Sequence, residues 1–374
     1  MISPKFFIEQ LQQAGIEFFA GVPDSLLKNM CAYITDHFDD KHNIIAANEG
    51  GAVALAAGYH LATGKVGCVY MQNSGEGNAV NPLASLTDRD VYHIPLLLII
   101  GWRGRPGVHD EPQHVKQGKI TTALLDVMGI RYEVLAKDEN AAGEQIEKAM
   151  QCIRKTGDGY ALVVEKDTFD NYTLQSAKVS EYTMSREDAI RTVAASIPAN
   201  AIIVSTTGMI SRELFEYRTD MGQGHERDFL TVGSMGHASQ IALGIALQKP
   251  DRNVFCFEGD GAVLMHTGSM AITASKKPGK FYHVVFNNGA HDSVGGQPTV
   301  ALDIDLVEIA YAMHYEHALC VWTPDQLKEA LENMFAEGLQ LIEIRVKKGN
   351  RKDLGRPTTT PIQNKEALMS FLKK

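Results

Sequence analysis

Apolar and polar positions alternate on two length scales along this chain. Short apolar runs rich in β-branched and aromatic side chains are separated by longer segments in which apolar residues recur every three to four positions. The short runs are typical of buried strands and the longer segments of amphipathic helices, so the alternation predicts parallel sheets covered by helices. The predicted strands are residues 17–22, 43–47, 66–71, 95–101, 131–135, 160–165, 201–205, 229–232, 253–257, 281–286, 316–321 and 339–346.

The strands form two sets of six, separated by a polar stretch at 167–185. We therefore predict an α/β protein with two similar domains, each a mostly parallel six-stranded sheet flanked by helices. The predicted boundaries are a first domain at 1–170, a linker at 171–184 and a second domain at 185–374. The clearest helices are predicted at 49–62, 141–155, 186–196, 237–247 and 324–336, and the basic segment 347–361 predicts an extended arm before a last short helix.

Composition narrows the class of protein. The chain has 374 residues, 44% hydrophobic and 22% charged, which is typical of a soluble globular protein of two domains. No apolar run approaches the ~20 residues of a membrane helix, and the N-terminus does not resemble a signal peptide, so we expect a cytoplasmic protein without a membrane partner. The cysteines are dispersed without a CxxC pair, which predicts buried, reduced thiols. The net charge of −9 argues against nucleic-acid binding and requires local cations for an anionic substrate.

The strongest chemical signal is Gly259-Asp260-Gly261, followed by Asn287-Asn288 after about one helix and one strand. Both polar groups follow predicted parallel strands, whose carboxyl ends form the ligand-binding edge of open α/β sheets. Carboxylate and amide oxygens are the hard ligands that Mg²⁺ and Ca²⁺ prefer. Gly261 allows a tight turn whose N–H groups face an anion at a helix start. The combination suits a metal–diphosphate.

This spacing resembles the diphosphate-binding signature of the thiamine diphosphate enzymes. The resemblance implies thiamine diphosphate and Mg²⁺ as cofactors, with Asp260, Asn288 and the backbone carbonyl of Ala290 as metal ligands. Gly259, Gly261 and Ala262 would contact the diphosphate, although the family usually has Ser where this chain has Ala262. Two α/β halves without a third domain match the short form of the family.

Glu49 is the second signal that resembles the family. It lies at a strand-to-helix turn before a helix rich in small residues, where the family has a glutamate that bonds to the aminopyrimidine ring and promotes loss of the thiazolium C2 proton. The resemblance makes Glu49 both cofactor-binding and catalytic. The alternative is a glutamate that only complements a helix N-terminus, worth ~0.3–1 kcal/mol.

Two further loops match cofactor-binding positions of the family. Gly233 and Met235 precede an Ala-rich helix, where the family has a carbonyl that accepts from the 4′-amino group and an apolar wedge between the cofactor rings. A helix-entry turn with a core methionine is the alternative. Thr206, Thr207 and Gly208 follow a strand and open a helix, so their hydroxyl and N–H groups are candidates for diphosphate binding.

Polar loops near the expected cofactor supply candidate substrate contacts. The loop 102–116 is dense in cations, which suits recognition of an anionic group, and either His114 or His109 is a candidate proton relay. The loop also contains the acids Asp110 and Glu111, so the alternative is a solvated loop whose charges balance. The predicted substrate contacts, from this loop, the loop 21–25 and the segment after the metal loop, are Ser25, Arg103, Arg105, His291 and Ser293.

The segments 21–25, 72–83, 99–119 and 287–299 are together similar to family members that decarboxylate 2-oxo acids bearing a phosphonate. Members acting on the sulfonate analogue, or condensing with a second oxo-acid, are the alternatives. The resemblance implies a small anionic 2-oxo acid as substrate and a homodimer or higher homo-oligomer with active sites between subunits. A nicotinamide dehydrogenase is disfavoured because no GxGxxG follows a strand. A catalytically inactive paralogue is disfavoured because Glu49, Asp260 and Asn288 are all present.

Overall fold

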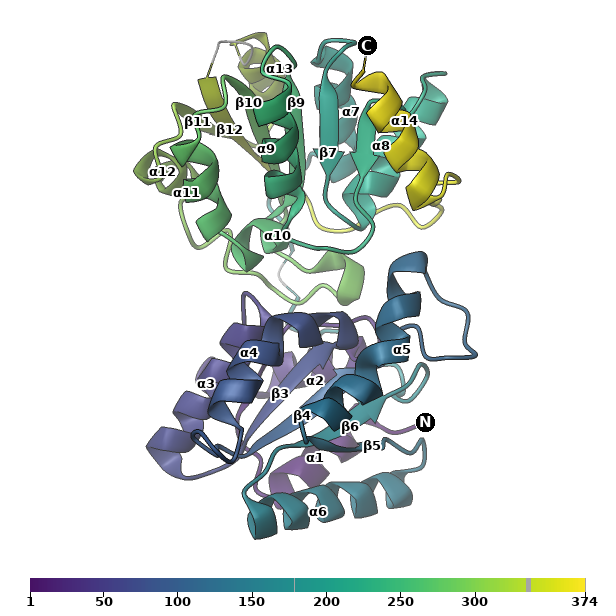
Figure 1. The fold of residues 1–374 in the computed structure, drawn as a ribbon, viewed down its shortest axis with the longest axis vertical. Helices are drawn as coiled ribbons and strands as arrows, with labels where there is room; N and C mark the ends of the chain where they lie inside the picture. The colour runs from purple at the N-terminus through teal and green to yellow at the C-terminus, as the bar shows by residue number, and fades with distance from the viewer. Residues whose placement is uncertain (178, 334–337, 374) are drawn as a thin grey trace. The chain divides into compact units, whose positions relative to one another are not determined.

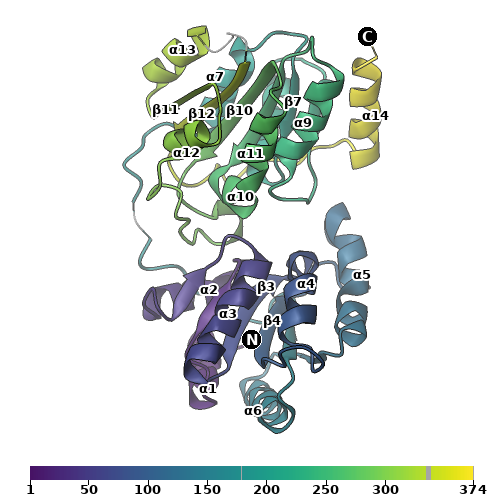
Figure 2. The same ribbon diagram turned by 60° about the vertical axis from the view of Figure 1, so that its left-hand side comes forward.

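Two compact units make up the protein. The computed structural model describes residues 1–177, 179–333 and 338–373. The first unit comprises 1–177, with the short segment 293–297 also assigned to it, and the second comprises the rest of the described chain. Each unit contains one six-stranded sheet with helices on both faces, as Figures 1 and 2 show. Every strand pair in both sheets is parallel, which confirms the predicted fold class.

The sheet of the first unit has the strand order β2-β1-β3-β4-β6-β5. Its strands are β1 (Phe19–Gly21), β2 (Asn43–Ile45), β3 (Gly67–Gln72), β4 (Leu96–Gly101), β5 (Arg131–Val134) and β6 (Tyr160–Val164). The central strands are mostly apolar because helices cover both faces. One face packs against α1 (Pro4–Gln13), α2 (Lys28–His37) and α6 (Glu139–Thr156), and the other against α3 (Glu49–Thr63), α4 (Glu76–Leu86) and α5 (Pro112–Val127).

The sheet of the second unit has the strand order β11-β12-β10-β9-β7-β8. Its strands are β7 (Ile202–Ser205), β8 (Asp228–Leu230), β9 (Val254–Gly259), β10 (Lys280–Asn287), β11 (His317–Val321) and β12 (Gly338–Arg345). One apolar core lies beneath α7 (Arg186–Ser196), α8 (Met209–Asp220) and α13 (Pro324–Asn333). The other lies beneath α9 (Ala238–Gln248), α11 (Gly268–Ser275), α12 (Leu306–Ala312) and the C-terminal helix α14 (Pro361–Phe371).

The predicted elements are observed with small shifts at their ends. All twelve strands exist, and the helix predicted at 324–336 is observed over Pro324–Asn333, while 334–336 lie outside the described residues. The thiols are free, as predicted, but only Cys31, Cys68 and Cys256 are buried, since Cys152 and Cys320 are half-exposed. None of the helices in the described ranges is long and apolar enough to span a bilayer.

Candidate active site

Asp260 lies where the second sheet ends. Strand β9 ends at Gly259, and Asp260 is the first residue of the short helix α10 (Asp260–Met265). The carboxylate is 3% exposed and accepts a hydrogen bond from the Thr299 hydroxyl. Burial raises the pKa of Asp260 to about 6, and the Thr299 hydrogen bond offsets this only in part. A bound cation would stabilise the charged form, so this carboxylate is suited to hold a metal ion.

Asn288 follows strand β10 and is fixed by a layer of polar contacts. Its Nδ2 donates to Asp292 at 2.6 Å, and its Oδ1 accepts from the backbone N–H of Ala290 at 3.0 Å. Asp292 also accepts from the Gly349 N–H at 2.8 Å and from Arg186 at 3.3 Å. The loop that carries two of the predicted metal ligands is thereby held by groups distant in sequence.

The turn at Gly261 is crowded by two other predicted site residues. A Cβ atom at Gly261 would lie 3.0 Å from the His291 ring and 3.4 Å from the Met235 methyl group. Burial lowers the pKa of His291 to about 4, so its imidazole is neutral. The structure therefore brings Met235, Gly261 and His291 together, and a side chain at Gly261 would press against both neighbours.

Two other loops meet beside this turn at the carboxyl end of β7. The Thr207 hydroxyl accepts from the Gly233 N–H at 3.1 Å, which joins the two predicted cofactor loops. The Thr206 hydroxyl is buried and has no hydrogen-bond partner in the described ranges. Gly208 precedes α8 with a φ of 99°, and Gly233 has a φ of 74°, conformations that favour glycine.

The groups described so far all belong to the second unit, and together they suit a metal–diphosphate. Asp260, Asn288 and the Ala290 carbonyl form a set of hard oxygen donors of the kind Mg²⁺ takes. The unpartnered Thr206 hydroxyl and the turn at Gly261 offer hydrogen-bond donors to an anion. These residues would hold the group through its metal and its phosphate oxygens.

In the first unit, Glu49 is a buried carboxylate at the start of α3. It is 5% exposed, and its Oε2 accepts from Asn78 Nδ2 at 2.7 Å. The preceding residue Asn48 caps the helix by accepting from the Gly51 N–H, so Glu49 is not needed as the cap. A Cβ at Gly75 would lie 2.2 Å from Glu49 Oε1, so a side chain there would displace the carboxylate. The environment fits a carboxyl group that bonds to a ring nitrogen.

Three of the predicted catalytic and substrate residues of the first unit share one network. Arg103 and His114 both bond to Asp110, and Ser25 joins the network by accepting from Arg103. Arg105 lies apart from it, because it forms an ion pair with Glu165 and its guanidinium stacks 5.8 Å from the Trp102 ring centroid.

The remaining two predicted residues are less constrained. His109 is exposed in the loop before α5, and Ser293 is exposed in the short helix η2 (Asp292–Val294). Sequence reasoning missed Asn78, Asp110 and Thr299 as functional neighbours. Asn78 and Asp110 belong to polar segments already noted, but only their contacts single them out.

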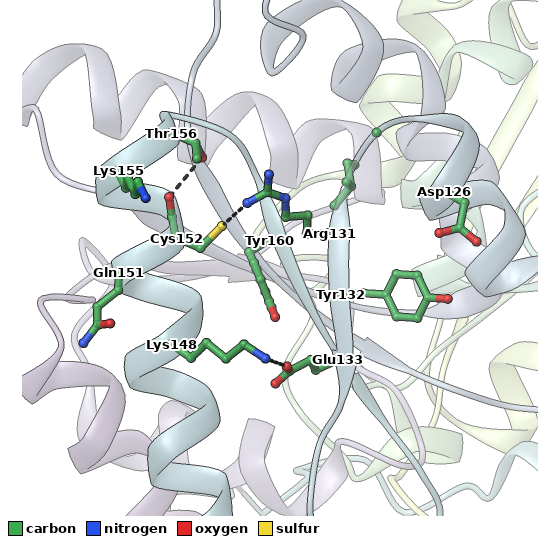
Figure 3. A pocket seen from close by; sticks show the side chains of 12 residues that line it. Asp126, Arg131, Tyr132, Glu133, Lys148, Gln151, Cys152, Lys155, Thr156 and Tyr160 are labelled. Atoms are coloured by element: carbon green, nitrogen blue, oxygen red, sulfur yellow. Dashed lines mark hydrogen bonds and ion pairs between the residues drawn. The ribbon is translucent and has the colours of Figure 1, made fainter.

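A cavity of about 830 Å³ lies elsewhere in the first unit, at the amino ends of β5 and β6 (Figure 3). Arg131 donates to Cys152 Sγ at 3.0 Å there, and Lys148 is paired with Glu133. This cavity is at the opposite end of the strands from Glu49 and Asp110, so it is separate from the candidate active site.

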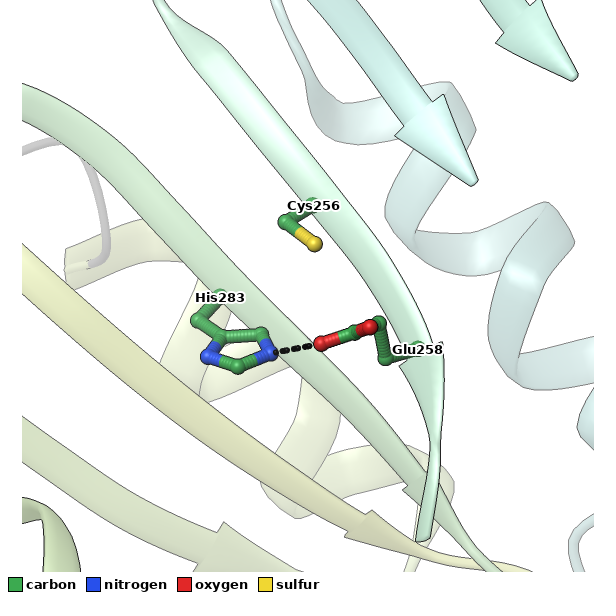
Figure 4. A group of neighbouring side chains, drawn as sticks. All are labelled: Cys256, Glu258 and His283. Atoms are coloured by element: carbon green, nitrogen blue, oxygen red, sulfur yellow. Dashed lines mark hydrogen bonds and ion pairs between the residues drawn. The ribbon is translucent and has the colours of Figure 1, made fainter. Parts of the chain in front are cut away.

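A buried polar cluster lies just before the metal loop (Figure 4). His283 Nε2 contacts Glu258 Oε2 at 2.9 Å and its Nδ1 contacts the Tyr315 hydroxyl at 3.2 Å. Cys256 lies opposite His283 in the register of β9 and β10, and the ligand-type atoms of Cys256, Glu258 and His283 all lie within 4.8 Å of one another. Since both ring nitrogens of His283 already have partners, we interpret the cluster as a structural contact that joins β9 to β10, the strands that precede Asp260 and Asn288.

Family models of known proteins match both units of the chain. The family described as "Thiamine pyrophosphate enzyme, N-terminal TPP binding domain" matches residues 4–127, and "Thiamine pyrophosphate enzyme, C-terminal TPP binding domain" matches residues 206–344. The chain therefore belongs to the family of thiamine diphosphate enzymes.

Its curated relatives cover both halves. The chain is 34% identical to a phosphonopyruvate decarboxylase of Streptomyces viridochromogenes, over 100% of this chain and 95% of the relative. It is 33% identical to a phosphonopyruvate decarboxylase of Streptomyces hygroscopicus, over 96% of this chain and 92% of the relative. A sulfopyruvate decarboxylase of Methanosarcina acetivorans is 28% identical, over 92% of this chain and 91% of the relative. The chain is accordingly a decarboxylase, a carboxy-lyase of this family.

Proposed function

We propose that the protein decarboxylates 3-phosphonopyruvate to phosphonoacetaldehyde and CO₂, with thiamine diphosphate and Mg²⁺, in phosphonate biosynthesis. The observation that carries this proposal is the similarity to phosphonopyruvate decarboxylases over the whole chain, including both candidate half-sites. When bound, the cofactor supplies a carbon nucleophile and accepts the electrons that the departing CO₂ leaves behind.

The chain's own residues would bind the cofactor and move protons. Asp260, Asn288 and the Ala290 carbonyl hold Mg²⁺, and Gly259, Gly261 and Ala262 contact the diphosphate. Thr206, Thr207 and Gly208 supply further N–H and hydroxyl donors. Glu49 bonds to the aminopyrimidine ring nitrogen, the Gly233 carbonyl accepts from its amino group, and Met235 separates the two rings. His114 or His109 relays the substrate proton.

The substrate is proposed to bind through polar groups of both units. Ser25 and Arg103 lie in one hydrogen-bond network and are suited to carboxylate or phosphonate oxygens. Arg105, His291 and Ser293 are the other proposed contacts. We propose that the protein is a homodimer or larger homo-oligomer with active sites between subunits, and that it works in the cytoplasm.

The proposal is tested by measuring CO₂ release from phosphonopyruvate, sulfopyruvate and pyruvate, with and without thiamine diphosphate and Mg²⁺. We expect cofactor-dependent release that is fastest with phosphonopyruvate. Faster release from sulfopyruvate would favour the alternative suggested by the Methanosarcina relative. A sulfonate carries one negative charge and a phosphonate nearly two at neutral pH, so a site with more cations should favour the phosphonate. Release from none of the three acids would contradict the proposal.

A further inference from the structure

A single carboxylate organises the loop between β4 and α5. Asp110 accepts five hydrogen bonds and is the centre of the loop. Arg103 donates to it through Nε at 2.8 Å and Nη2 at 2.5 Å, and His114 contacts it through Nδ1 at 2.9 Å. The backbone N–H groups of Gly104 and Glu111 each donate at 2.8 Å. Both carboxylate oxygens are therefore occupied by groups of the loop and of α5.

The contact with Asp110 determines which nitrogen of His114 carries its proton. Although burial acts in the opposite direction, the bonds from Arg103, His114 and Gly104 hold the pKa of Asp110 well below its usual range, so it is an ionised acceptor. His114 Nδ1 is therefore the protonated nitrogen, and Nε2 has the free lone pair. Burial lowers the pKa of His114, and the charged groups around it are Asp110, Arg103 and Asp24. The ring is a neutral base at neutral pH.

The same carboxylate fixes the guanidinium of Arg103. With Nε and Nη2 bound to Asp110, Nη1 is the nitrogen that donates to Ser25 Oγ, at 2.7 Å. The Arg103 guanidinium is therefore held in one orientation, with its Nη1 edge beside the Ser25 hydroxyl. A planar guanidinium held in this way can orient an anionic oxygen rather than only attract it.

We propose that Asp110 is the positioning residue of the substrate loop, which fixes His114 as the Nδ1–H tautomer and directs the Nη1 edge of Arg103 toward Ser25. The inference rests on the proposed function for its consequence in catalysis. Asp110 acts through its neighbours, as the groups that support a catalytic histidine do in other enzymes, where their loss costs about 10- to 100-fold or more.

The test compares Asp110→Asn with Asp158→Asn. Asp158 is a matched control because it also accepts from an arginine, Arg89, and contacts a histidine, His93, at 3.1 Å, but on the surface near the opposite ends of the strands. An asparagine at 110 places an NH₂ group against existing donors. We expect kcat for phosphonopyruvate to fall about 100-fold or more, KM to rise, and the acid limb of kcat/KM to move to lower pH. Asp158→Asn should retain the wild-type values.

Two measurements separate positioning from a purely structural role. Nitrogen NMR of histidine-labelled, unliganded wild-type protein, assigned with His114→Gln, should show His114 protonated at Nδ1 and not at Nε2. In addition, Asp110→Asn combined with His114→Gln should have about the same kcat as His114→Gln alone, because residues that act as a unit are not additive.

The possible outcomes are distinct. An Nε2–H tautomer in the wild type overturns the proposal even if Asp110→Asn does not fold. A folded Asp110→Asn protein with wild-type kcat, KM and pH profile overturns it as well. If the wild type releases no CO₂ from phosphonopyruvate, the proposed function fails, while the tautomer measurement still decides this inference.

Discussion

Three buried or partly buried carboxyl groups of this chain differ in pKa, because their burial and their hydrogen-bond partners differ. Asp110 is ionised because five donors surround it, whereas burial of Asp260 raises its pKa to about 6 in spite of its hydrogen bonds. Neither oxygen of the buried Glu76 carboxyl forms a hydrogen bond within the described residues, and burial raises its pKa to about 8. At neutral pH these are an acceptor, a cation-seeking group and a neutral acid, respectively.

Glu49→Gln is predicted to separate cofactor binding from turnover. The amide keeps the size of the side chain but cannot carry the charge that stabilises the protonated ring nitrogen. We expect thiamine diphosphate to bind within a few-fold of wild type by calorimetry, and kcat to fall about 10²- to 10⁴-fold. Glu139→Gln is the control, because Glu139 is likewise the first residue of a helix, α6. Equal turnover of Glu49→Gln and wild type would assign Glu49 only to the helix N-terminus.

Glu76→Gln is predicted to stabilise the protein at high pH. The folded-state pKa of about 8 is above the ordinary value of 4.5, so the folded state holds a proton that the unfolded state releases. Stability from this group is therefore fully present below pH 4.5 and is lost as the pH rises from there to about 8. We expect similar denaturation midpoints at about pH 4 and a variant more stable by ~1–3 kcal/mol at pH 8.5. The exposed Glu144→Gln is the control, and a variant less stable at pH 8.5 would contradict the prediction.

At the scale of elements, the loop after β4 is held against α5 by close backbone contact. A Cβ atom at Gly104 would lie 1.9 Å from the His114 carbonyl oxygen, and one at Gly118 would lie 1.8 Å from the Gly104 carbonyl oxygen. Gly104 also has a φ of 68°. The helix therefore cannot approach the loop, and His114 cannot reach Asp110, unless both positions lack side chains.

Gly104→Ala and Gly107→Ala are predicted to differ sharply. Both glycines have positive φ, of 68° and 86°, so alanine costs each about 1–2 kcal/mol of backbone strain. Of the two, Gly104 adds a collision, since a Cβ at Gly107 meets no atom of the described residues within 4 Å. We expect Gly104→Ala to lose most activity and many degrees of melting temperature, and Gly107→Ala to keep its activity and lose only about 2–6 °C. Similar losses in both variants would show that strain alone matters.

At the scale of the whole molecule, the candidate chemistry is divided between two units of similar architecture. Glu49 and the network of Asp110 belong to the first, and the metal loop and its supporting contacts belong to the second. Each half-site is built at the carboxyl ends of its own parallel strands, as open α/β sheets build ligand sites. Neither half has all of the groups that the proposed reaction needs.

Mixed oligomers test the proposal that active sites lie between subunits. Glu49→Gln and Asp260→Ala should each be inactive alone. If one subunit supplies Glu49 and another Asp260, a mixed dimer has one intact site, so co-expressed chains should recover about a quarter of wild-type activity. Recovery should fall on dilution that dissociates the oligomer. No recovery in oligomers shown to be mixed would mean that each chain builds its site alone.

The sequence determined the elements and the metal loop, because both depend on local order. A buried strand can be recognised from its own apolar run. Asp260 and Asn288 follow directly after such runs, so parallel pairing of the two strands places both residues at one edge of the sheet. The tertiary structure decided the contacts between side chains. Thr299 bonds to Asp260, Asn78 donates to Glu49, and Asp110 pairs with Arg103 of its own loop. Those contacts depend on which side chains the packing brings together, and the same residues in solvent would show none of them.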